Sequence, residues 1–391
     1  MIITILYFAF FSWGLYPNSI GSLRMMLRGR YKWTMRLDKK IMDRNTKLID
    51  MVVERAKRDF PDDIALIGLT GSFSTNDFHE KSDLDLIIVN NTERGWEISD
   101  GFIFDDVGFD IYCTPWDNLE KKSELDCVGV SSLTELQILY CAKPEHLKRF
   151  NALREKALKK LSEGISAECI KRADKHIKLA KQDYADTLLS CDIGTVRYAS
   201  SGVLYNVVNG IVSLNNTCIK RGIKRYLQEL LTYNHLPENF ENLYMSLVDA
   251  KSVDDIRKAS GLLLYAVISL REKLHQEFVE KPVPTYDNLD GWYEECWSNN
   301  RNKLINSTAE KNKSYAFLAA AGAQNYFDEM TERLGTKKYD LMQYFDSDNL
   351  EKTLEAFMSV MEDYLNEYKK VGRDVERYET FEELYDAYMK G

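Results

Sequence analysis

Two carboxylates, Asp83 and Asp85, lie two positions apart at the start of the apolar stretch SDLDLIIVN. With the two-residue period of a β-strand, both side chains point to one face of a sheet, with their Cα atoms about 7 Å apart. Burying both is costly unless one of them takes up a proton. A divalent cation removes this problem, because Mg²⁺ takes carboxylate oxygens and keeps waters for a substrate phosphate. The pair therefore predicts a metal site.

A third carboxylate, Asp110, lies in GFDIY on the next strand that the pattern predicts. Three carboxylates from two neighbouring strands are the minimum for two ions a few Å apart, the arrangement used for in-line phosphoryl displacement. We therefore predict that Asp83, Asp85 and Asp110 bind metal. Asp105 and Asp106 remain alternatives to Asp110.

Gly71 and Ser72 end the preceding apolar run, IALIGLTGS. A glycine turn lets backbone N–H groups approach phosphate oxygens, and the serine hydroxyl adds a donor. An ordinary turn would explain these two residues taken alone. Together with the carboxylates, they predict a phosphate cradle beside a metal site.

These residues need a small α/β unit to position them. Apolar residues recur at helical spacing from about 37 to 60, and Pro61 ends that helix. Strand patterns follow at 64–72, 83–89, 107–115 and 138–141, with 101–106 as a hairpin partner and 123–137 as a helix.

From Pro144 onward the strand pattern is replaced by helical periods and short polar loops, which predict an antiparallel bundle. We expect helices over 144–161, 167–190, 195–214, 223–236 and 253–278. Two of the seven prolines mark a boundary at 280–290, followed by a helical, tyrosine-rich region whose aromatic residues we assign to core packing. The fold class is α+β, with domains at 35–143, 144–280 and 281–391.

Composition limits the function. The 391 residues carry a net charge of −9, and residues 281–391 hold 22 acidic against 14 basic side chains, so the rest is nearly neutral. No basic face is available for a nucleic-acid polymer. Seven scattered cysteines without a C-x-x-C pair favour reduced thiols and a cytoplasmic location.

The first 16 residues, MIITILYFAFFSWGLY, are apolar but span only about 24 Å as a helix, less than a bilayer core. One interpretation is a short membrane anchor. We favour a translation start at Met35, which makes residues 1–34 a non-native extension, so a membrane partner is disfavoured.

The motifs GS at 71–72, DLDL at 83–86 and FDI at 109–111 resemble the polymerase-β-type nucleotidyltransferase superfamily. Their order is most similar to the kanamycin nucleotidyltransferase-like, two-domain antibiotic-modifying enzymes. The resemblance implies a nucleotidyltransferase-fold mixed sheet with flanking helices, followed by a helical bundle. It covers about 45–250, so residues 251–391 extend beyond it. After Gly71-Ser72 this chain continues with FSTND, whereas members of that family more often have a small or basic residue directly after the Gly-Ser pair.

The resemblance also implies roles. Gly71 and Ser72 would hold the phosphates of ATP or another nucleoside triphosphate, and two Mg²⁺ ions would bind the three aspartates. Asp183 is the candidate helix carboxylate that activates the acceptor hydroxyl, with Asp186 one turn away. Lys224 is a candidate phosphate ligand, the alternative being a solvated basic helix face.

The predicted activity is transfer of a nucleoside monophosphate to a hydroxyl of a small molecule such as an aminoglycoside-like antibiotic. The alternatives are a protein-modifying, antitoxin-like transferase and a non-catalytic nucleotide-binding module. A homodimer is left open. His79 and His176 are expected at the surface, and NVVN at 206–209 is expected to be polar positions inside the bundle.

Overall fold

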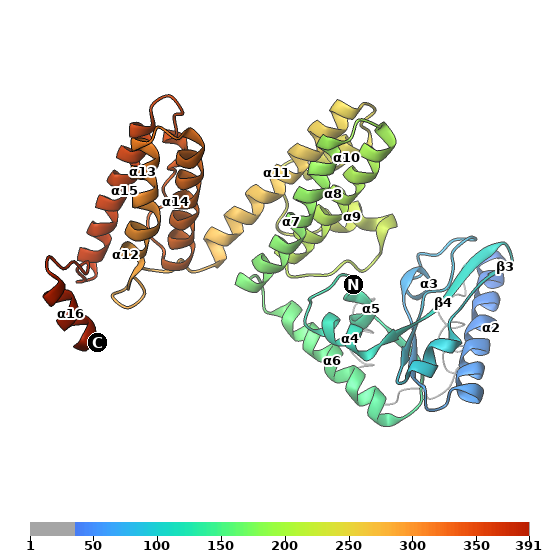
Figure 1. Cartoon of the computed structure of the whole chain (residues 1–391). Helices are drawn as coiled ribbons and strands as arrows, with labels where there is room; N and C mark the ends of the chain where they lie inside the picture. Colours follow the sequence, from blue (N-terminus) through green and yellow to red (C-terminus); the bar gives the residue numbers. More distant parts are fainter. Residues whose placement is uncertain (1–35, 391) are drawn as a thin grey trace, which may run out of the picture. The chain divides into compact units, whose positions relative to one another are not determined.

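The computed structural model describes residues 36–390, so the predictions for residues 1–34 lie outside it. The described chain divides into two compact units, one ending at Val279 and one beginning at Glu280. The first unit contains a mixed sheet with flanking helices and then a group of long helices; the second is helical (Figure 1). The predicted α+β class is confirmed.

A five-stranded sheet forms the centre of the N-terminal part, in the order β3-β4-β2-β1-β5. β2 and β4 run parallel, and the other neighbouring pairs are antiparallel. The strands are β1 (Ile64–Leu69), β2 (Leu86–Asn90), β3 (Asp100–Phe104), β4 (Val107–Pro115) and β5 (Gln137–Cys141).

Helices cover both faces of this sheet, because successive strand residues alternate between two apolar cores. Leu84, Leu86 and Ile88 pack in the core that includes helix α2 (Arg36–Asp59). Ile87 and Val89 pack in the other core, with helix α4 (Trp116–Ser123) and helix α6 (Pro144–Ser162). Figure 1 shows α2 on one side of the sheet and α4 and α6 on the other.

The short elements around the sheet are α3 (Gly71–Thr75), the 3₁₀ helix η1 (Glu93–Ile98) and α5 (Ser131–Thr134). The prediction of one helix over 123–137 is wrong, since a loop separates α4 from α5. Leu125 and Gly129 both have positive φ there, which a continuous α-helix does not allow.

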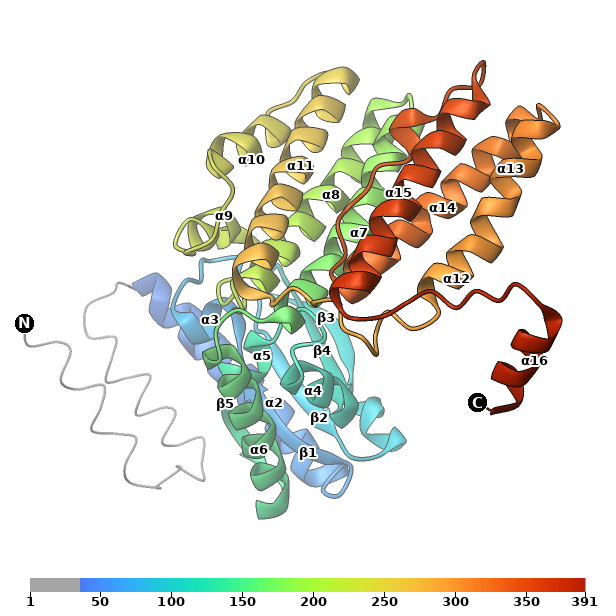
Figure 2. The same ribbon diagram turned by 90° about the vertical axis from the view of Figure 1, so that its left-hand side faces the viewer.

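Three long helices form the second part of this unit: α7 (Ala167–Leu189), α8 (Ile193–Leu214) and α11 (Val253–Phe278). They lie side by side in Figure 2 and share a core with residues such as Val203, Val207 and Leu263. Shorter helices complete it: η2 (Ile223–Arg225), α9 (Tyr226–Leu230) and α10 (Phe240–Val248). The helix predicted over 223–236 is therefore too long, because the chain leaves the helical conformation after Leu230.

The second unit has its own core, in which Tyr293, Phe327 and Tyr364 are buried. The prediction that its aromatic residues serve packing is confirmed for these side chains. Its elements are α12 (Trp292–Cys296), the π-helical turn η3 (Trp297–Arg301), α13 (Asn302–Ala309), α14 (Lys313–Leu334), η4 (Met342–Tyr344), α15 (Leu350–Lys370) and α16 (Phe381–Lys390).

Candidate active site

The Asp-x-Asp pair precedes strand β2 instead of lying within it. β2 begins at Leu86, so the prediction of a strand over 83–89 is wrong at its start. The backbone N–H of Thr70 still donates to the carbonyl of Asp85 at 3.0 Å, which continues the β1–β2 pairing by one residue. Asp83 is exposed and Asp85 is half-buried. Only one of the two carboxylates is therefore desolvated by the fold.

Gly71 lies directly against the side chain of Asp85. Its φ is +72°, and a Cβ built at this position would overlap Oδ2 of Asp85. The same carboxylate accepts a hydrogen bond from the backbone N–H of Ser72. Residue 71 thus needs glycine for two reasons, its left-handed backbone and the close approach of the carboxylate. The predicted phosphate cradle and the predicted metal ligand are in contact.

The pKa of Asp85 is raised above its ordinary value. Burial contributes most, the negative charge of Asp83 acts in the same direction, and the hydrogen bond from Ser72 opposes them. A half-buried carboxylate beside a second carboxylate is unfavourable without a cation.

Asp110 lies on β4 and is exposed. Ile87 of β2 pairs with Tyr112 of β4 in parallel register. Extending this register by two residues toward the start of both strands places Asp85 beside Asp110. The charges of Asp85 and Asp110 both raise the pKa of Tyr112, after the larger effect of burial. The sheet therefore brings Asp110 to the same face and end as Asp85.

The two alternatives to Asp110 have other partners. Asp105 and Asp106 form the β3–β4 turn, both with positive φ. Asp105 pairs with Lys40 at 2.9 Å and Asp106 with Lys81 at 2.5 Å.

The donor chemistry fits a hard divalent cation, since carboxylate oxygens are what Mg²⁺ prefers, and burial, with the charge of Asp83 adding to it, raises the pKa of Asp85. Within residues 36–390, however, no group of three or more His, Cys, Asp or Glu side chains is gathered closely enough to hold a metal ion. Asp83, Asp85 and Asp110 therefore share one end of the sheet through backbone register, but their carboxylates are not gathered around a single point.

Asp183, the predicted base, lies on α7 and is half-buried against α8. Asn206 of α8 donates its amide N–H to Oδ2 of Asp183 at 2.8 Å. Gly202 makes room for the carboxylate, because a Cβ there would lie 2.7 Å from its Cγ. The fold therefore orients Asp183, whereas Asp186 is exposed.

Lys224, the predicted phosphate ligand, contacts Asp77 in the loop after α3. Its Nζ lies 3.1 Å from the carbonyl oxygen and 3.3 Å from Oδ1 of Asp77. Arg225 makes the stronger contact, because its Nε and Nη2 each donate to the Asp77 carboxylate at 2.8 Å. Together these cations hold the pKa of Asp77 well below its usual range, with the hydrogen bond from Arg225 as the largest cause.

The sequence pattern did not identify Asp77, Asn206 or the bidentate role of Arg225. Asp77 and Arg225 are 148 positions apart, and no local spacing connects them. His79 is exposed as predicted, but His176 is half-buried, so the prediction of a surface position is wrong for His176.

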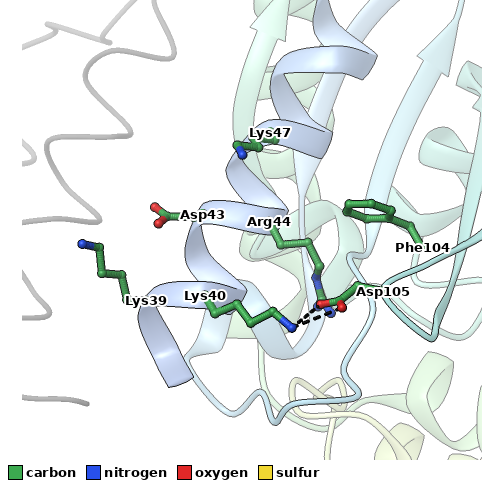
Figure 3. Close-up of a pocket in the computed structure, with 7 residues that line it drawn as sticks. All are labelled: Lys39, Lys40, Asp43, Arg44, Lys47, Phe104 and Asp105. Carbon is green, nitrogen blue, oxygen red and sulfur yellow. Dashed lines mark hydrogen bonds and ion pairs between the residues drawn. The ribbon is translucent and has the colours of Figure 1, made fainter. Parts of the chain in front are cut away.

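A separate open hollow of about 550 Å³ lies on α2; Asp105 lines it, but Asp83, Asp85 and Asp110 do not. Figure 3 shows Lys39, Asp43 and Lys47 along the helix, with Lys40 joined to Asp105 of the hairpin turn. It belongs to the helix that covers the face of the sheet opposite Asp85. It therefore does not include the candidate site.

Comparison with known proteins identifies the class. Residues 49–162 match the family model of the nucleotidyltransferase domain. The chain therefore contains a nucleotidyltransferase domain, consistent with the polymerase-β-type superfamily, and the protein is an enzyme of the nucleotidyltransferase class. The domain implies a nucleotide substrate.

One solved structure that the chain resembles is a nucleotidyltransferase-like protein from Exiguobacterium sibiricum 255-15. The two sequences are 11% identical over 87% of this chain and 96% of that chain, with a TM-score of 0.33. No curated protein matches the chain. None of the helices within residues 36–390 has the length and apolar character needed to cross a bilayer.

Proposed function

We propose that the protein transfers a nucleoside monophosphate from a nucleoside triphosphate, with ATP as the first candidate, to a hydroxyl group of a small molecule, and that the transfer depends on Mg²⁺. The observation that carries the proposal is the contact of Gly71 and Ser72 with the carboxylate of Asp85. A phosphate-binding turn and a metal-binding carboxylate must adjoin in an enzyme that acts on a metal–triphosphate complex.

Asp83, Asp85 and Asp110 would hold the metal, which would supply charge stabilisation for the triphosphate and the leaving pyrophosphate. The backbone N–H groups at Gly71 and Ser72 would orient the phosphates. Ser72 N–H now donates to Asp85, so phosphate binding there would require this hydrogen bond to be exchanged.

The acceptor oxygen would form a bond to the α-phosphorus, while the bond between that phosphorus and the pyrophosphate oxygen breaks. The acceptor proton would pass to a carboxylate, for which Asp183 is the candidate because Asn206 fixes its orientation. Lys224 could reach a triphosphate by leaving Asp77, since Arg225 would continue to neutralise that carboxylate.

A small-molecule acceptor is preferred to a protein because the helical part of the first unit forms a cavity against the part that carries the sheet, residues 36–143, here called the catalytic domain. The excess of acidic residues in 281–391 belongs to the second unit. It therefore does not bear on which acceptor binds to the first unit.

The test is calorimetry of Mg²⁺-ATP binding to the parent and to the double variant Asp83→Ala with Asp85→Ala. We expect binding to the parent that requires Mg²⁺ and that the double variant loses. Asp106→Ala is the matched control, because it removes a nearby carboxylate from the hairpin turn. Equal Mg²⁺-dependent binding by parent and double variant would contradict the catalytic proposal.

A further inference from the structure

A second cavity, of about 260 Å³, lies in the first unit between the catalytic domain and the long helices. One wall is the loop 125–131 between α4 and α5. The other walls come from α7, from α8 and from the segment 217–226 that follows α8. Its volume is below the ~300–1,000 Å³ typical of pockets for drug-sized ligands. The cavity therefore suits a smaller compound.

Contacts between the two walls place this cavity at the end of the sheet that carries the carboxylates. β5 begins at Gln137, which pairs with Leu69, the last residue of β1 before the Gly71 turn. Just before β5, Thr134 hydrogen-bonds the cavity residue Cys218. Glu135 pairs with Lys220 at 3.1 Å. The segment 217–226 thus bridges the cavity and the sheet end where Asp85 and Asp110 lie.

The ionised groups that line the cavity do not suit a polycation. Arg172 and Lys175 contribute two positive charges, and Asp126 contributes the only lining carboxylate. That carboxylate already pairs with Lys175 at 2.5 Å. Arg172 donates to Oδ1 of Asn216 at 2.8 Å, and its charge also helps to lower the pKa of Asp126. An entering ligand would therefore meet a slightly positive environment.

The remaining lining combines uncharged hydrogen-bonding groups with apolar side chains. His176, Tyr205, Asn209 and Tyr226 can each donate or accept, and Val128 and Val212 supply apolar surface. Nδ1 of His176 is buried and has no hydrogen-bond partner among the described residues. Burial lowers the pKa of this imidazole, which favours its neutral form.

We propose that this cavity binds a compact polyhydroxy compound with a single ring, neutral or carrying one negative charge, and that this compound is the hydroxyl acceptor. The acceptor role rests on the proposed nucleotidyl transfer; the binding itself does not. A three-ring, polycationic aminoglycoside exceeds the volume of the cavity and is opposed by its charge.

A hydrogen-bonded path joins the cavity to the candidate base. Asn206 hydrogen-bonds the His176 ring and also donates to Asp183. A ligand that contacts the His176 ring would therefore lie next to the residue that orients Asp183. This path gives the acceptor site a direct structural link to proton removal.

The binding test uses saturation-transfer NMR on the full chain, with glucose, myo-inositol and glucuronate as probes and kanamycin as the polycationic comparison. We expect at least one of the three single-ring probes to bind. Val128→Trp should weaken that binding by about tenfold or more, because Val128 lines the cavity and is 44% exposed, which lets the fold tolerate a larger side chain. Leu189→Trp is the control, since Leu189 is 82% exposed on α7 and lies outside the cavity lining.

Three results would overturn the proposal: no binding of any single-ring probe at millimolar concentration, binding unchanged by Val128→Trp, or preferred binding of kanamycin. The double variant Asp83→Ala with Asp85→Ala separates the two proposals. Its loss of Mg²⁺-ATP binding with probe binding retained would support both. Probe binding without any Mg²⁺-dependent ATP binding by the parent would leave the cavity a binding site and reject the transferase mechanism.

Discussion

The backbone of Gly71 and the carboxylate of Asp85 occupy adjoining space so tightly that residue 71 has no room for a side chain. One residue belongs to the turn after β1 and the other precedes β2, and the antiparallel pairing of these strands brings them together. A change at either position should therefore disturb phosphate binding and metal binding at once.

Gly71→Ala should abolish Mg²⁺-ATP binding, because the new methyl group displaces the Asp85 carboxylate. Gly164→Ala is a matched control: Gly164 also has positive φ, at +81°, but a Cβ there meets nothing within 4 Å. Both variants should lose about 1–2 kcal/mol of unfolding free energy from left-handed strain. Calorimetry and urea denaturation would check this, and equal ATP binding by the two variants would refute the role of the contact.

Arg225→Ala should loosen the segment 217–226 against the catalytic domain, because it removes the two hydrogen bonds from Arg225 to Asp77 and leaves only the weaker contacts of Lys224 with that residue. Hydrogen exchange measured by mass spectrometry should then rise in 217–226 and around Asp77. Arg225→Lys should give an intermediate result, since lysine keeps the charge but not the bidentate geometry. Higher salt should reduce the difference between parent and variant.

The control for this prediction is Arg271→Ala, which removes another bidentate pair, with Asp174, inside the helical part of the same unit. It should leave exchange in 217–226 unchanged. If Arg271→Ala raised hydrogen exchange in 217–226 as much as Arg225→Ala does, the increase would reflect a general loosening of the fold and not the loss of the contact with Asp77.

His176 should make the stability of the fold depend on pH below neutrality. Burial lowers its pKa below the ordinary 6.5; the hydrogen bond with Asn206 opposes this and the charge of Lys175 adds to it. Between the folded-state pKa and 6.5, the unfolded chain binds more protons than the folded chain does, so the unfolding free energy falls as pH falls through this window. Asp126, paired with Lys175, and Arg172 are the other charges at this cavity.

His176→Gln should remove this part of the pH dependence. Urea denaturation of parent and variant at neutral pH and at a series of values below 6.5 would check it. The unfolding free energy of the parent minus that of His176→Gln should become smaller, or change sign, as the pH is lowered. A difference independent of pH would show that His176 does not titrate in this way.

Residues 280–391 should fold when expressed alone, because their core is internal to the unit. Phe327 is fully buried and stacks on Phe357 at 5.8 Å between ring centroids. Phe327→Ala should therefore lower the unfolding free energy of this unit by about 3–5 kcal/mol. Leu318→Ala, exposed on the same helix, should change it by less than about 0.5 kcal/mol. A non-cooperative denaturation curve for the isolated unit would contradict its independence.

Local patterns determined the class of this protein. The helix that becomes α2, the apolar strand runs and the motifs around Gly71, Asp85 and Asp110 were evident in the sequence, because strand alternation and glycine turns act over a few residues. The predicted ends of several elements were wrong. β2 starts at Leu86 and not at Asp83, and the helix predicted over 123–137 is the end of α4, a loop and the short helix α5. There, pairing with β4 and positive φ angles decide where elements begin and end.

Only the tertiary structure decided which distant residues meet. It sets Asp85 beside Asp110 by strand register and joins Asp77 to Arg225. It also brings Asn206 of α8 against both the half-buried His176 and Asp183 of α7. These contacts depend on how helices and strands pack, and no short-range period in a sequence encodes packing between segments many positions apart. The sequence thus determined the chemistry that the catalytic domain carries, and the packing of α7 and α8 against it decided the shape and charge of the cavity beside that chemistry.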